Sequence, residues 1–148
     1  MLKWINIILP IALLTGLHAP VYAEVTVKPF TTDGCSMFPD GDLNNRQRWL
    51  NCCIEHDHSY WQGGTWQQRL QADRNLEYCV AKTGMPKLAK LMMGGVRVGG
   101  SPFIPTEFRW GYAWDYLRGY QPLNKEEQLA LDKAWKQYQS MLKPAQQK

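Results

Sequence analysis

The chain has few histidines and only a small excess of positive charge. Only three histidines occur among 148 residues, and the formal net charge is +4. A domain that binds nucleic acid usually carries a dense basic patch, so we expect no nucleic acid partner. Repeats and low-complexity runs are also missing from the sequence. A chain of this length suits one domain and is too short for two of ordinary size.

Long apolar runs are nearly missing as well, and the single one lies at the start of the chain. Lys3 precedes the apolar residues 4–17, and Val21-Tyr22-Ala23 is a small-x-small cleavage motif. A short membrane anchor is the alternative, but the run is too short to span a bilayer comfortably and Pro10 interrupts it. We therefore expect residues 1–23 to be a signal peptide and the protein to be periplasmic or secreted. Loss of Lys3 lowers the charge to +3, which is compatible with an anionic lipid surface.

The four cysteines are few, but their placement is informative. All of them lie between Cys35 and Cys79. In an exported protein an even number of cysteines predicts disulfides. Cys52 and Cys53 are neighbours, and a bond between neighbours requires a strained ring. Two pairings remain, in which Cys35 joins one neighbour and Cys79 joins the other.

The remaining pattern predicts a mostly α class, with a helical hairpin at its centre. Residues 43–62 contain no helix breaker and end at Gly63-Gly64. Thr65 and Gln68 have the spacing of a capping box, which predicts a second helix to about residue 83. So short a connection requires an antiparallel hairpin. Asp73 falls on the apolar stripe of the second helix, and a buried carboxylate needs a partner.

Elements outside the hairpin are predicted from shorter signals. We expect an extended arm over 24–30, a loop over 31–42, a short helix over 86–93 and a glycine-rich loop over 94–105. A helix is expected over 106–118. A last helix should open at the Asn124–Glu127 capping box, and the tail from about 143 is polar. The last helix has one apolar face, formed by Leu131, Trp135, Tyr138 and Leu142. Residues 24–148 are predicted to form one domain.

Residues 52–60 carry most of the chemical information. Cys52, Cys53, His56 and His58 are possible zinc ligands. Adjacent cysteines seldom bind one zinc, and an exported protein seldom keeps free thiolates. A second possibility is a disulfide-rich helix whose polar residues, His58 included, lie on the surface.

A third interpretation explains more of the residues. The pattern Cys-Cys-x-x-His-Asp-x-x-Tyr is matched by Cys52, Cys53, His56, Asp57 and Tyr60. Asp73-Arg74-Asn75 follows, with Cys79 six residues after the aspartate, and Asp33-Gly34-Cys35 precedes. In these three motifs the chain resembles the secreted phospholipase A2 family, and its short spacing is similar to the compact bacterial and fungal members.

This resemblance implies a catalytic centre and a cofactor. His56 would be the general base, and Asp73 would hold it in one tautomer with help from Tyr60. The implied cofactor is Ca²⁺, bound by Asp57 and by the carbonyls of Gly34, Ser36 and Phe38. The implied disulfides are Cys35–Cys53 and Cys52–Cys79. The implied reaction is calcium-dependent hydrolysis of a fatty acyl ester in a glycerophospholipid at a membrane surface.

Two departures from the family pattern matter for function. The loop after Cys35 is poorer in glycine than the family's calcium loop, so Asp40 or Asp42 is a further candidate ligand. The segment after Gly84 corresponds to nothing in the family pattern. A non-catalytic protein of the same fold, binding lipid or a protein partner, is therefore the alternative function.

Overall fold

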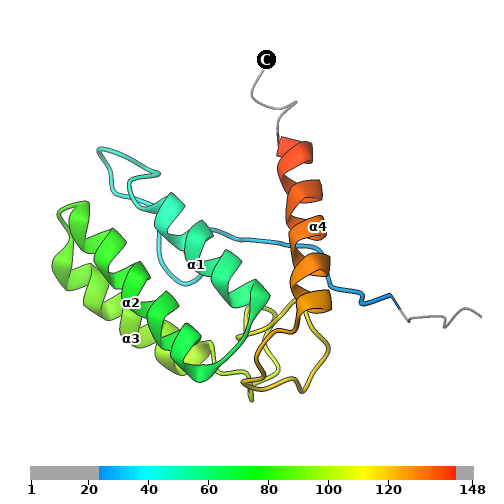
Figure 1. The fold of residues 1–148 in the computed structure, drawn as a ribbon. Helices are drawn as coiled ribbons and strands as arrows, with labels where there is room; N and C mark the ends of the chain where they lie inside the picture. The colour runs from blue at the N-terminus through cyan, green and yellow to red at the C-terminus, as the bar shows by residue number, and fades with distance from the viewer. Residues whose placement is uncertain (1–23, 143–148) are drawn as a thin grey trace, which may run out of the picture.

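The computed structural model describes residues 24–142, and this part of the chain contains four α-helices (Figure 1). They are α1 (Leu50–Gln62), α2 (Trp66–Lys82), α3 (Pro86–Gly99) and α4 (Lys125–Leu142). Residues 24–142 contain no strand, so the predicted mostly α class is confirmed. The predicted signal peptide and the polar tail from 143 lie outside the described residues.

Helices α1 and α2 run antiparallel, joined only by Gly63, Gly64 and Thr65. Gly63 has a φ of 74°, a conformation that favours glycine and ends α1 abruptly. The predicted capping box is present: the Thr65 hydroxyl accepts from the Gln68 amide, and the Gln68 side chain accepts from the Thr65 amide. The short connection therefore turns the chain back along α1.

Two disulfides hold this hairpin and the loop before it. Cys52 in the first turn of α1 is bonded to Cys79 near the end of α2. Cys35 in the loop is bonded to Cys53. This is the pairing implied by the resemblance, and it ties the 31–49 loop to the same helical turn that is tied to α2. Each such bond is worth roughly 3 kcal/mol of stability.

Helix α1 begins seven residues later than the sequence predicts. Residues 43–49 form turns instead. The Asp42 carboxylate accepts hydrogen bonds from the amides of Asn44 and Asn45, and it pairs with Arg48 at 2.6 Å. Aspartate stabilises such turns by competing with helical hydrogen bonds.

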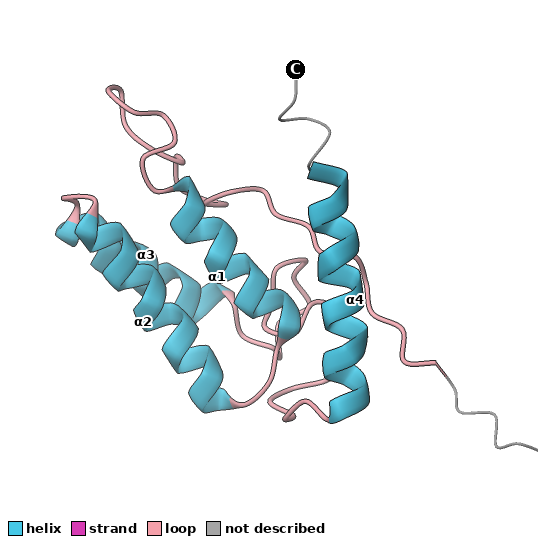
Figure 2. Cartoon of the chain, turned by 45° about the horizontal axis from the view of Figure 1, so that its top comes forward, coloured by secondary structure: helices cyan, strands magenta, loops and turns pink. Residues whose placement is uncertain are grey.

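Helix α3 is longer than predicted and lies alongside α2 (Figure 2). The prediction of a loop from Gly94 is wrong, because the helix continues to Gly99. Glycine costs about 1 kcal/mol relative to alanine in a helix. Burial of Ala89 and Met92 against α2 and the loop offsets part of that cost. Tertiary packing thus overrides local propensity here.

The predicted helix over 106–118 is also wrong. The segment forms turns, and Gly111 has a φ of 75°. Its amides bond to the last turn of α1, from Gly111 to the Tyr60 carbonyl and from Ala113 to the Trp61 carbonyl. The segment thereby satisfies carbonyls that the end of a helix leaves unpaired.

Helix α4 packs through aromatic side chains on the extended arm and on α1. Trp135 and Tyr138 contact Phe30, and the ring of His58 lies 4.0 Å from that of Trp135. The sequence predicts a surface position for His58, but the residue is half-buried, with its ring in this aromatic cluster. Leu131 is buried, whereas Leu142 at the end of the predicted face is exposed. No helix within residues 24–142 has the length and apolarity needed to span a membrane.

Candidate active site

His56 and Asp73 meet between the two helices of the hairpin. Nε2 of His56 lies 3.0 Å from Oδ1 of Asp73. The Asp73 side chain is completely buried, and His56 is 7% exposed. Within residues 24–142, Nδ1 of His56 has no hydrogen-bond partner. An Nε2–H bonded to Asp73 would leave Nδ1 as the basic nitrogen of the ring.

Tyr60 completes the contacts of the same carboxylate oxygen. Its hydroxyl donates to Oδ1 of Asp73 at 2.7 Å and accepts from Nε of Arg69 at 3.0 Å. Burial and the neighbouring Asp73 charge both raise the pKa of Tyr60 above its usual value. The hydroxyl therefore stays protonated and remains a donor, as a positioning group for Asp73 requires.

Arg97 forms an ion pair with the other carboxylate oxygen of Asp73. Its Nε lies 2.7 Å from Oδ2, in an ion pair that is not aligned as a hydrogen bond. Arg97 comes from the last turn of α3, beyond the segment that carries the family resemblance. Arg69 fixes that turn by donating to the carbonyls of Val96 and Arg97. The sequence prediction missed Arg97 because it placed this segment in a loop.

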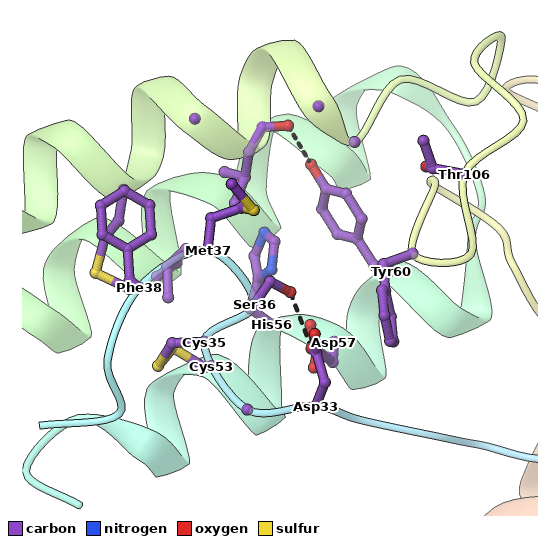
Figure 3. Close-up of a pocket in the computed structure, with 18 residues that line it drawn as sticks. Asp33, Cys35, Ser36, Met37, Phe38, Cys53, His56, Asp57, Tyr60 and Thr106 are labelled. Atoms are coloured by element: carbon purple, nitrogen blue, oxygen red, sulfur yellow. Dashed lines mark hydrogen bonds between the residues drawn. A yellow bond between two sulfur atoms is a disulfide. The ribbon is translucent and has the colours of Figure 1, made fainter. Parts of the chain in front are cut away.

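A largely apolar cavity of about 410 Å³ opens beside His56 (Figure 3). Figure 3 shows His56 among the labelled residues, with Asp33 and Asp57 together on one side. The apolar walls of the cavity come from the 31–49 loop, from α2 and α3, and from the segment after α3. These residues are Met37, Phe38, Leu76, Met92, Val96 and Phe108. The cavity could accept an elongated apolar group next to the base.

Asp57 faces the same cavity one residue beyond His56. Its carboxylate is 7% exposed and accepts a hydrogen bond from the Thr32 hydroxyl at 2.6 Å. Burial raises the pKa of Asp57 to about 7; the bond from Thr32 opposes this, and the nearby Asp33 carboxylate adds to it. A buried carboxylate beside a second carboxylate gains from a bound cation.

The backbone of the loop around Cys35 takes two conformations with positive φ. Gly34 and Ser36 have φ values of 78° and 51°. A Cβ at Gly34 would collide with the Asp40 carboxylate, whose Oδ1 accepts from the Cys35 amide at 3.0 Å. Asp40 thus supports the loop from within, and Asp42 is engaged with Arg48. Asp33 lines the cavity near Asp57 and is therefore a better candidate ligand than Asp40 or Asp42, although the sequence did not suggest it.

The residues present fit a hard cation such as Ca²⁺. Gly34, Ser36, Phe38 and Asp57 all line the cavity, as does Asp33. Within residues 24–142 no three His, Cys, Asp or Glu side chains gather closely enough to hold a metal by themselves. A calcium ion here would depend on backbone carbonyls together with Asp57 and Asp33, the kind of oxygen set that calcium accepts. The zinc hypothesis is wrong, since every cysteine is in a disulfide.

Comparison with known proteins found no matching family model, no matching curated protein and no matching solved structure.

Proposed function

We propose that this chain is a calcium-dependent esterase with a phospholipase A2-like fold, which hydrolyses a fatty acyl ester in glycerophospholipids. The observation that carries the proposal is a buried His56–Asp73 pair that opens on an apolar cavity. Three sequence motifs in the family's order support it independently. The disulfides favour an oxidising compartment, which agrees with a periplasmic or secreted location.

In the proposed reaction His56 acts as general base. Its Nδ1 takes a proton from water as the water oxygen attacks the ester carbonyl carbon. Asp73 accepts a hydrogen bond from Nε2–H, which fixes the tautomer and stabilises the imidazolium that forms. His56 then returns the proton to the leaving alkoxide as the ester bond breaks. The products are a fatty acid and a lysophospholipid.

The oxygen groups beside His56 have a separate role. Asp57, Asp33 and the carbonyls of Gly34, Ser36 and Phe38 would hold the ion. Bound calcium would supply positive charge that polarises the ester carbonyl and stabilises the oxyanion. The Ser36 amide is the proposed second donor to that oxygen. Met37, which is 92% exposed at this cavity, is the proposed contact with the lipid surface.

The test is release of fatty acid from vesicles of mixed phospholipids, followed by mass spectrometry, with calcium and with chelator. The proposal expects fatty acid and lysophospholipid in calcium and neither in chelator. Binding to vesicles without hydrolysis under any calcium concentration would support the non-catalytic alternative. Hydrolysis that chelator leaves unchanged would contradict the calcium requirement.

A further inference from the structure

Helix α3 contains three glycines in 14 residues, a composition that lowers the stability of a helix. A glycine in a helix interior costs about 1 kcal/mol relative to alanine, which applies to Gly94 and Gly95, whereas Gly99 is the last residue of α3. Gly95 and Gly99 lie one turn apart, and both line the cavity beside His56. Gly94 does not line it, and nothing in the structure explains Gly94. The first question is whether packing requires glycine at the two lining positions.

Packing does not require glycine at either position. A Cβ at Gly95 would lie 3.7 Å from Cε2 of Phe38, an ordinary contact. A Cβ at Gly99 would meet no atom within 4 Å. Gly100 is a useful contrast, because a Cβ there would collide with the ring of Tyr60. Gly100 is therefore explained by packing, whereas Gly95 and Gly99 leave space that the protein itself does not fill.

The space they leave is part of the cavity that His56 lines. Apolar side chains border the same space, from Phe38 on the loop to Met92 and Val96 on α3. Gly95 and Gly99 are exposed to solvent and line this space, so a side chain added at either position can extend into the cavity, and a larger one takes up more of it. The apolar surroundings favour an alkyl chain as the occupant over a polar head group.

We propose that Gly95 and Gly99 form the open wall against which the fatty acyl chain lies, and that they set the longest chain the enzyme accepts. This inference rests on the proposed function and adds the residues that determine its acyl specificity. They are specificity-determining residues, because they touch the chain and not the reacting ester. Leucine at either position would shorten the space available to the chain and leave His56 and Asp73 in place.

The experiment compares Gly95→Leu and Gly99→Leu with the matched control Gly94→Leu. The control makes the same change in the same helix at an exposed position outside the cavity. Values of kcat/KM are measured for phosphatidylcholines with short, medium and long acyl chains. We expect the ratio of long-chain to short-chain kcat/KM to fall at least ~10-fold in the two cavity variants, as filling of an apolar pocket implies. The control should keep the wild-type ratio.

A second measurement keeps the inference testable without catalysis. Fatty acids of the same chain lengths are used to displace a fluorescent fatty acid from each variant. Selective loss of long-chain binding in the cavity variants supports the inference. If wild type hydrolyses no ester, the proposed function is contradicted, but this binding result still supports the inference. Equal chain-length profiles in all three variants overturn it. Melting curves check folding, and Gly95→Ala and Gly99→Ala replace any leucine variant that does not fold, with a smaller shift in the same direction expected.

Discussion

Nε2 of His56 lies 3.0 Å from Oδ1 of Asp73, although 17 residues separate them in the sequence. The contact exists because Gly63 and Gly64 end α1 so sharply that α2 returns along it. The Cys52–Cys79 disulfide holds the far end of the same hairpin. A completely buried carboxylate is tolerated there because Tyr60 and Arg97 also contact it.

Replacement of Arg97 by methionine should destabilise the protein strongly. The change leaves the Asp73 carboxylate buried without its cation, which costs about 3–5 kcal/mol for a fully buried pair. We expect the lower end of that range, because the Arg97 side chain is 28% exposed. Urea denaturation measures the loss, and the double variant Arg97→Met, Asp73→Asn should recover part of it. Arg74→Met, an exposed change on α2, is the control and should alter stability by less than about 0.5 kcal/mol. An Arg97 variant as stable as that control would contradict the charge-compensation role.

Calcium affinity should depend on Asp57 and Asp33. Each carboxylate-to-amide change removes a full charge and keeps the shape, so Asp57→Asn and Asp33→Asn should each weaken binding at least ~10-fold. The starting dissociation constant should be weak, on the order of 10⁻⁴ to 10⁻³ M as in extracellular sites. Calorimetric titration measures both. Asp42→Asn is the control, since Asp42 pairs with Arg48. Loss of calcium binding in the Asp42 variant alone would show that the ligand assignment is wrong.

Stability without calcium should depend on pH through Asp57. The unfolded chain releases this proton near its ordinary pKa of 3.8, whereas the folded protein keeps it up to about pH 7. The contribution is therefore stabilising below pH 3.8 and is lost as the pH rises through 7. The stability difference between wild type and Asp57→Asn should shift against wild type over this window, by at most about 1.4 kcal/mol per pH unit. Denaturation in chelator at several pH values measures the difference, and a difference that stays constant from pH 4 to pH 8 would refute the assignment.

The hairpin was predictable from the sequence because its signals are local, whereas the residues left two disulfide pairings open and the family resemblance implied the one that is found. Gly63-Gly64 and the Thr65–Gln68 capping box specify the turn within six residues. Asp73 lies on an apolar stripe, so the sequence predicts that its buried carboxylate has a hydrogen-bond or ion-pair partner. The motif around His56 then leaves little choice of partner.

The rest was not predictable, because long-range contacts decide it. The glycines of α3 favour a loop locally, and only packing on α2 keeps the helix going to Gly99. This error concealed Arg97, whose ion pair with Asp73 spans 24 residues of sequence. Asp33 was not predicted as a ligand because only the folded loop brings it near Asp57.

The most direct test of the central claim is fatty acid release from phospholipid vesicles by the His56→Gln variant in saturating calcium. Glutamine keeps much of the packing and removes the imidazole base. The account predicts a rate at least ~10²-fold below wild type, the low end for loss of a general base. The melting temperature and calcium affinity should remain close to those of wild type. Hydrolysis by this variant at the wild-type rate would contradict the account, because it would show that His56 is not the base.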